Sequence, residues 1–306
     1  MKKLLSTTAL CMMSFGASAA DLPSRVLAPA PYAAVVPFDA FGALSVGYNW
    51  ATISQGGFST DANGIDMSAR ATFAAPVFER FGFQADGEFN RNVYKISTGL
   101  GDLKRNSADL AGHAFWRDSS VGLLGVIAQA VSNESSLGIL SDRRYFLGAE
   151  GQYFIGNVTL YGQAAYENAN FGLPLASGVT ADGVIVAAQA RYFATPNWSV
   201  ALKGSYESIK ASFVGNNINH KGWLVGAQTD YRFDNTPYSV FATADYRDGK
   251  FSNNGGKDHE TRVMLGGKLN FGSKTLFERD RSGASLDPIR SLQAVIPLVG
   301  GQQQQP

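Results

Sequence analysis

The sequence predicts an all-β protein, a transmembrane antiparallel up-and-down β-barrel of about twelve strands. Three observations predict this fold. The chain opens with an export signal, and from residue 41 to residue 271 its apolar side chains recur with a period of two. No run after the export signal approaches the roughly 18–20 consecutive apolar residues that a membrane-spanning helix needs. A barrel of strands that each have one apolar and one polar face accounts for all three observations.

The export signal occupies residues 1–20. Two lysines precede an apolar stretch at residues 4–15, and small residues end at Ala19 and Ala20, after either of which we expect cleavage. Cys11, the one cysteine of the chain, leaves with this peptide, and Thr8-Ala9-Leu10 before it does not match a lipidation signal. The mature chain therefore has no disulfide to stabilise it outside the cytoplasm.

The charge of the mature chain argues against a nucleic-acid partner. Removing Lys2 and Lys3 leaves 24 of the 26 basic residues against 25 acidic ones, whereas a nucleic-acid-binding surface needs a basic excess. The chain contains 34 glycines and 12% aromatic residues. For an exported protein without disulfides, this composition favours a membrane barrel over a soluble enzyme.

Residues 21–40 are predicted to form a proline-rich periplasmic linker, and residues 41–271 to form the barrel. In the segment 223–233, Trp223, Val225 and Tyr231 alternate with Asp230 and Arg232, which gives the strand one apolar and one charged face. The same pattern predicts strands at 41–53, 65–75, 81–92, 107–117, 121–132, 143–155, 158–167, 183–194, 198–208, 221–233, 238–247 and 260–271.

Soluble β-sandwiches also alternate, so two further features decide between the classes. The connections are predicted to be short and long in turn, which is the usual asymmetry of outer-membrane barrels. The long ones fall near residues 54–64, 93–106, 133–142, 168–182, 209–219 and 248–258. In addition, aromatic residues at the ends of the apolar face predict two membrane girdles, a lower one of Tyr153, Tyr192, Tyr231 and Phe271 and an upper one of Tyr166, Tyr206 and Tyr246.

Two short motifs resemble those of a known group. Asp21-Leu22-Pro23-Ser24-Arg25, followed by Ala28-Pro29-Ala30-Pro31-Tyr32, is similar to the mature N-terminus of small porin-like outer-membrane proteins of alphaproteobacteria. The stretch Gly266-Gly267-Lys268-Leu269-Asn270-Phe271 resembles the last-strand signal that the barrel-assembly machinery recognises, although 35 residues follow Phe271 here. The resemblance implies residence in the outer-membrane lipid and passive diffusion of small hydrophilic solutes.

The charged faces of the strands are predicted to point into the lumen, because Arg or Lys on a lipid face costs roughly 2–4 kcal/mol at mid-membrane. The candidate lumen-lining residues are Arg70, Asp86, Glu88, Asp109, Arg144, Glu150, Arg191, Lys203, Asp230, Arg232, Asp245, Arg262 and Lys268, together with Asp66, Arg117, Glu207 and Arg247. Such charges can line a narrow wet channel or pair into a closed plug. Small inward residues such as Ser68, Ser199 and Thr243 favour the channel.

We predict no catalytic residue, metal site or cofactor. His113, in Asp109-x-x-x-His113, is expected inside the barrel, where it can pair with an acid. In Asp258-His259-Glu260, a candidate rim hydrolase site, neighbouring residues face opposite ways. The spacing of Asp61 and Asp66 is a weak match to a calcium loop.

Residues 272–306 are predicted to be a periplasmic tail that either stays outside the barrel or enters the lumen. Within it, residues 274–281 are expected to be charged and solvated, and Ile289, Leu292, Val295 and Ile296 have the spacing of a short amphipathic helix. The leading hypothesis is a porin-like channel. The alternatives are a closed structural or surface-interaction barrel and, third, a barrel enzyme with a rim hydrolase site.

Overall fold

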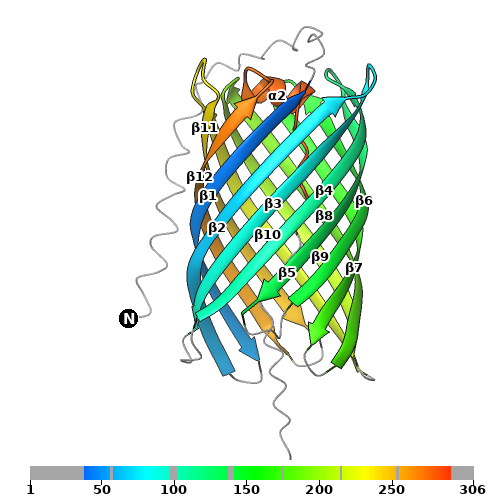
Figure 1. The fold of residues 1–306 in the computed structure, drawn as a ribbon, viewed down its shortest axis with the longest axis vertical. Helices are drawn as coiled ribbons and strands as arrows, with labels where there is room; N and C mark the ends of the chain where they lie inside the picture. Colours follow the sequence, from blue (N-terminus) through cyan, green and yellow to red (C-terminus); the bar gives the residue numbers. More distant parts are fainter. Residues whose placement is uncertain are drawn as a thin grey trace, which may run out of the picture.

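The computed structural model describes residues 38–55, 58–96, 102–136, 141–173, 176–213, 216–252 and 255–290. Twelve antiparallel strands close into a barrel, which confirms the predicted fold (Figure 1). The predicted signal peptide and nearly all of the predicted linker lie outside the described residues. Among the described residues, no helix is long and apolar enough to cross a membrane.

Each strand pairs with its sequence neighbours, and the barrel closes where the last strand meets the first. Phe271 lies opposite Ala40 at this seam, and Ser54 lies opposite Lys257 at its other end. Phe271 therefore ends the closing strand even though the chain continues. The strands are β1 (Asp39–Gln55), β2 (Phe58–Pro76), β3 (Phe81–Ile96), β4 (Asp102–Asp118), β5 (Gly122–Ser135), β6 (Ser141–Ile155), β7 (Val158–Leu173), β8 (Ala176–Thr195), β9 (Trp198–Phe213), β10 (Asn216–Arg232), β11 (Tyr238–Phe251) and β12 (Lys257–Phe271).

The predicted long loops were wrong, because the strands continue through most of them. The stretch predicted as a loop at 168–182 belongs largely to β7 and β8, and the stretch at 54–64 belongs largely to β1 and β2. These extensions carry polar residues on both faces, with Asp182, Lys210 and Lys221 exposed on the outside. A strand needs about 9–11 residues to cross the membrane. The extra residues therefore project beyond it, where neither face has to be apolar.

The outer face of the barrel carries large apolar side chains. Leu147 and Leu202 are 68% and 65% exposed on this face. All seven predicted girdle aromatics are exposed on it as well, between 39% for Tyr246 and 57% for Tyr153. Large exposed apolar side chains on every side of a barrel are compatible with lipid and not with water.

The chain does not leave the barrel after β12. A short helix, α2 (Leu276–Ser282), lies across the mouth at the end where β1 begins and β12 ends, at the top of Figure 1. The prediction that residues 274–281 are solvated was wrong, because Leu276, Phe277, Asp280 and Arg281 are buried there. Ile289 lies in an irregular segment rather than in a helix. Leu292, Val295 and Ile296 lie outside the described residues.

Candidate functional site: the lumen and its plug

Residues 272–290, which we call the plug, fold back from β12 into the lumen. The chain reverses at Gly272, whose φ of 92° lies in the left-handed region. A side chain there would also collide with the carbonyl oxygen of Phe38, so both the conformation and the space favour glycine. Of the two alternatives for the tail, entry into the lumen is the one that the described residues adopt.

A single carboxylate at the start of the barrel fastens both ends of α2. Asp39 accepts hydrogen bonds from the backbone N–H groups of Ser273, at 2.9 Å, and Ala284, at 3.1 Å. Its side chain is buried, so these charge-assisted bonds are shielded from water. Asp39 lies in the stretch predicted to be a linker, and this role was not predicted.

The helix α2 is docked on the short turns of the barrel. Phe277 donates its backbone N–H to the carbonyl of Pro196 at 2.9 Å, and its ring packs edge-on against Phe193 with centroids 5.2 Å apart. Arg281 donates to the carbonyl of Gly156 at 2.8 Å. Thr275 caps the helix by accepting from the N–H of Glu278 at 3.0 Å. These contacts hold α2 across the mouth.

Glutamines on the wall bind the backbone of the segment 283–290. Gln84 on β3 accepts from the N–H of Leu286 at 3.2 Å and donates to its carbonyl at 2.7 Å. Gln129 on β5 pairs in the same way with Ile289, at 2.7 and 3.0 Å. A side-chain amide carries a donor and an acceptor, so it can replace the strand neighbour that this buried backbone lacks.

Apolar contacts complete the attachment on the same side of the barrel. Ile289 is 4% exposed and lies in a cluster with Ile127, Val131, Phe146, Ala165 and Ile185. Leu286 is 2% exposed and packs against Phe115, Leu123 and Tyr161. These wall residues lie on β4, β5, β6, β7 and β8, on strand faces that point into the barrel. Apolar side chains therefore dominate that part of the interior.

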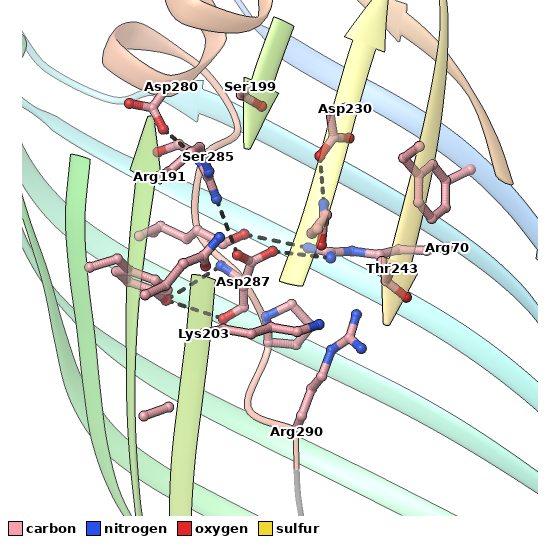
Figure 2. Close-up of a pocket in the computed structure, with 18 of the residues that line it drawn as sticks. Arg70, Arg191, Ser199, Lys203, Asp230, Thr243, Asp280, Ser285, Asp287 and Arg290 are labelled. Carbon is pink, nitrogen blue, oxygen red and sulfur yellow. Dashed lines mark hydrogen bonds and ion pairs between the residues drawn. The ribbon is translucent and has the colours of Figure 1, made fainter. Parts of the chain in front are cut away.

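Arginines on β2, β4 and β8 contact the plug. Arg117 on β4 donates to the carbonyl of Gly283 at 2.7 Å and to the hydroxyl of Ser285 at 2.9 Å. Arg191 on β8 pairs with Asp280 at 2.5 Å and with Asp287 at 3.4 Å, and Arg70 on β2 contacts the other oxygen of Asp287 at 3.3 Å. Figure 2 shows Asp287 between Arg70 and Arg191.

The arginines around the plug carboxylate Asp287 favour its charged form. Burial acts to raise the pKa of Asp287, but the guanidinium groups of Arg70, Arg191 and Arg290 outweigh this effect and hold the pKa below its usual range. Its side chain is nevertheless 38% exposed to the lumen, whereas that of Asp280 is 1% exposed. The two acidic residues of the plug therefore differ in how readily a solute can reach them.

The structure places all thirteen candidate lumen-lining residues on the inward faces of strands and brings most of them together in networks. Lys203, Arg262 and Arg290 share Asp245, at 2.7, 3.0 and 3.7 Å. Lys268 pairs with Asp230 and Arg70 with Asp86, while Glu88 accepts from Ser68. Arg144 pairs with Asp142 and Glu167 toward the far end, and Asp109 accepts from Ser107. Arg232 contacts the plug carbonyl of Ser273.

His113 lies inside the barrel and pairs with acids, as expected. It contacts Glu150 on β6 at 2.7 Å and Asp86 on β3 at 3.2 Å. Asp258 is buried and His259 exposed, so these two neighbours face opposite ways, as strand geometry requires. Asp61 is exposed and Asp66 buried against Arg262, so the weak calcium motif does not converge.

Two adjoining cavities remain beside the plug. The first, of about 160 Å³, lies between the plug and a wall lined by residues such as Ser45, Ser68, Lys203, Gln228 and Thr243. The second, of about 140 Å³, lies toward the far end of the barrel. Glu88, Leu224, Arg262, Pro288 and Arg290 line both. A cavity needs about 10–15 Å³ for each water that it holds, so both cavities have room for several waters.

The glutamines that hold the plug were not predicted. Gln84, Gln129, Gln152 and Gln163 are inward residues of β3, β5, β6 and β7 and all contact the plug backbone. No sequence signal sets them apart, because Gln189 and Gln228 face the lumen from the other half of the barrel.

Comparison with known proteins supports the fold. Neither protein-family models nor curated protein sequences give a match. Among solved structures, an outer-membrane channel from Pseudomonas putida F1 is 14% identical, with a TM-score of 0.59 over 79% of this chain and 99% of that one. The translocator domain of the autotransporter NalP from Neisseria meningitidis is 14% identical, with a TM-score of 0.47 over 86% and 94%. The KdgM porin in complex with oligogalacturonate is 10% identical, with a TM-score of 0.38 over 74% and 99%.

At 14% identity, the similarity to the Pseudomonas putida channel shows the fold alone. The TM-scores of the other two structures are too low to support a conclusion. The closed twelve-stranded barrel, its apolar outer band and its charged interior define the class of protein. The protein is an outer-membrane β-barrel.

Proposed function

We propose that the protein is an outer-membrane channel for the passive diffusion of small hydrophilic solutes, and that its plug narrows the channel. The observation that supports this proposal is a pair of adjoining cavities beside the plug, which share five lining residues. We infer that the two cavities join into one polar passage. The mouth that holds α2 is proposed to face the periplasm, because the short turns of outer-membrane barrels lie on that side.

The wall of the passage supports solute flow rather than closure. Its side chains include hydroxyls and amides such as Ser45, Ser205 and Gln189, which offer hydrogen bonds without filling the space. Arg290 of the plug is exposed to the lumen. Charges that line a narrow passage from opposite sides set up a field across it and select among permeant ions and solutes.

A closed structural barrel is the second candidate, and the dense attachment of the plug favours it. Hydrogen bonds join the plug to the wall from the mouth at Asp39 to mid-barrel at Gln129. In that case, the cavities would hold trapped water and conduct nothing. The two candidates differ in one measurable property, the conductance of the full-length mature chain.

The test is single-channel recording of the refolded mature chain in a planar bilayer. A matched pair of variants locates the current. In Ser205→Trp a large ring enters the first cavity, and in Ala227→Trp the same ring is added to the exposed outer face of β10. We expect discrete, salt-dependent steps for the parent chain, clearly smaller steps for Ser205→Trp and parental steps for Ala227→Trp.

Two results would contradict the channel. One is a silent parent chain whose heat-modifiable migration in gels shows that it has folded. The other is a conducting parent chain whose steps Ser205→Trp leaves unchanged, because the current would then bypass the cavity beside the plug.

A further inference from the structure

The barrel interior has two arcs with different contents. The arc from β3 to β7, which we call the dry arc, holds the plug through glutamines, Tyr161 and apolar side chains. The arc from β8 through β12 to β2, which we call the wet arc, faces the first cavity with residues such as Lys203, Gln228 and Lys268. Arg191 on β8 and Arg70 on β2 lie where the arcs meet. They contact Asp287 from the two edges of the wet arc.

Each of these arginines is held by a second carboxylate. Arg70 pairs with Asp86 at 2.7 Å, and Arg191 pairs with Asp280 at 2.5 Å. The side chains of Asp86 and Asp280 are each 1% exposed, so water and solutes do not reach them. Both guanidinium groups therefore keep their positions when Asp287 turns away.

Asp287 itself is free to turn because its backbone is anchored separately. Gln163 donates to its carbonyl at 2.6 Å, and Tyr161 donates to the same oxygen at 3.2 Å. The carboxylate extends from this fixed backbone toward the cavity and is 38% exposed. A change in its side-chain rotamer alone would release both arginine contacts, with the plug still docked.

We propose that Arg70 and Arg191 form a binding site for the carboxylate group of a small organic anion, and that Asp287 occupies this site in the absence of solute. The proposal rests on the channel function above and names its preferred class of solute. Two guanidinium groups can each donate to one oxygen of a carboxylate, which is the arrangement that Asp287 now has. A solute carboxylate entering from the cavity takes the same two donors.

An internal competitor lowers the apparent affinity for the solute. A tethered group acts at an effective concentration in the millimolar range. Where this exceeds the dissociation constant of the competitor by about tenfold, removing it tightens solute binding by about tenfold. Asp287→Asn removes the charge, keeps the shape and leaves both arginines in place. It is therefore expected to strengthen binding, whereas loss of a merely structural residue would weaken it.

The experiment is isothermal titration calorimetry of the refolded, detergent-solubilised mature chain with potassium succinate in a low-chloride buffer. We expect weak binding by the parent chain, about tenfold tighter binding by Asp287→Asn, and no measurable binding by Arg191→Gln. Glu278→Gln is the control, because it removes the same charge from the same plug at a residue whose carboxylate accepts from the N–H of Lys274 instead. It should match the parent chain.

The double variant Asp287→Asn with Arg191→Gln distinguishes a defined binding site from a general effect of lumen charge on succinate binding. The proposal predicts that the double variant does not bind succinate. It is overturned if Asp287→Asn binds no more tightly than the parent chain, or if Arg191→Gln or the double variant still binds. Heat-modifiable migration checks that each variant has folded. Because calorimetry does not depend on current, a silent channel that still shows this binding pattern contradicts the channel function alone.

Discussion

Replacing Arg191 by alanine is expected to loosen the plug without unfolding the barrel. Asp280 would lose its 2.5 Å contact with Arg191 while its side chain stays buried at 1% exposure. Asp287 would keep Arg70, and Arg70 would keep Asp86. The substitution therefore leaves Asp280 short of a partner and makes the free energy of docking α2 less favourable.

The size of this effect follows from the partners that Asp280 retains. Removing one partner of a buried ion pair costs about 3–5 kcal/mol when the other charge is left uncompensated. Here Thr159 still donates to Asp280 at 2.5 Å, and Arg281 lies 3.8 Å from it. We therefore expect a smaller loss of about 2–3 kcal/mol in the free energy of docking the plug. This corresponds to a roughly 30- to 150-fold increase in the open population.

Thiol labelling measures that population. Ser285→Cys places one thiol at a position that is 5% exposed when the plug is docked, and the mature chain should contain no other, since Cys11 lies in the predicted signal peptide. When reclosing is faster than modification, the labelling rate is proportional to the open population. The rate should rise by the same roughly 30- to 150-fold factor in the Arg191→Ala background.

Arg80→Ala is the matched control. Arg80 is 46% exposed and pairs with Asp118 at 3.2 Å in a short turn outside the lumen, so its loss should cost at most about 1 kcal/mol and none of it at the plug. Labelling rates that are equal in the Arg191→Ala and Arg80→Ala backgrounds would refute the argument that the Arg191–Asp280 pair holds α2.

Three further outcomes are expected. Ile289→Ala removes most of a buried side chain from the apolar cluster on the dry arc, which should cost about 2–5 kcal/mol and speed labelling of the same thiol. Leu202→Arg puts a charge on the outer face between the two predicted aromatic girdles and should lower barrel stability in vesicles by about 2–4 kcal/mol. Urea unfolding, with Leu202→Ala as the control, measures this loss. Truncation after Phe271 removes the plug and should raise single-channel conductance several-fold, whereas truncation after Arg290 keeps residues 272–290 and should not. Equal conductance of the two truncations would contradict a plug that narrows the lumen.

The period of two was enough to predict the barrel because lipid imposes it on every spanning strand. A charge on the outer face is costly at mid-membrane, so residues such as Arg232 and Lys268 alternate strictly with apolar ones. This constraint ends at the membrane surface. Beyond it, strand residues such as Lys210 and Asp182 lose the alternation while their backbones remain paired, and the sequence pattern therefore predicted loops there.

The plug was harder to predict because no local pattern marks it. Residues 272–290 have no period of two, and α2 is short and carries Glu278, Arg279 and Arg281, which is typical of a solvated tail. Their burial depends on partners far away in the sequence. Asp39 contacts Ser273 across 234 positions, and Gln84 contacts Leu286 across 202. Closure of the barrel brings such distant residues together. Alternation predicts the closed barrel, but it does not predict which segment of the chain fills the lumen.

The contacts of the wall arginines also indicate that the plug is part of the folded barrel rather than a passing occupant. A lumenal arginine in an open channel is satisfied by water or by acids on other strands of the wall, as Arg262 is by Asp66 and Asp245. Arg117 is buried at 9% exposure, and its guanidinium donates to Gly283 and Ser285 of the plug. Without the plug, this buried charge would lose both bonds, at a cost of about 1–3 kcal/mol or more. The dry arc is therefore built around the plug, and regulated flow has to be sought on the wet arc, where a side-chain rotation at Asp287 changes the passage and the plug stays docked.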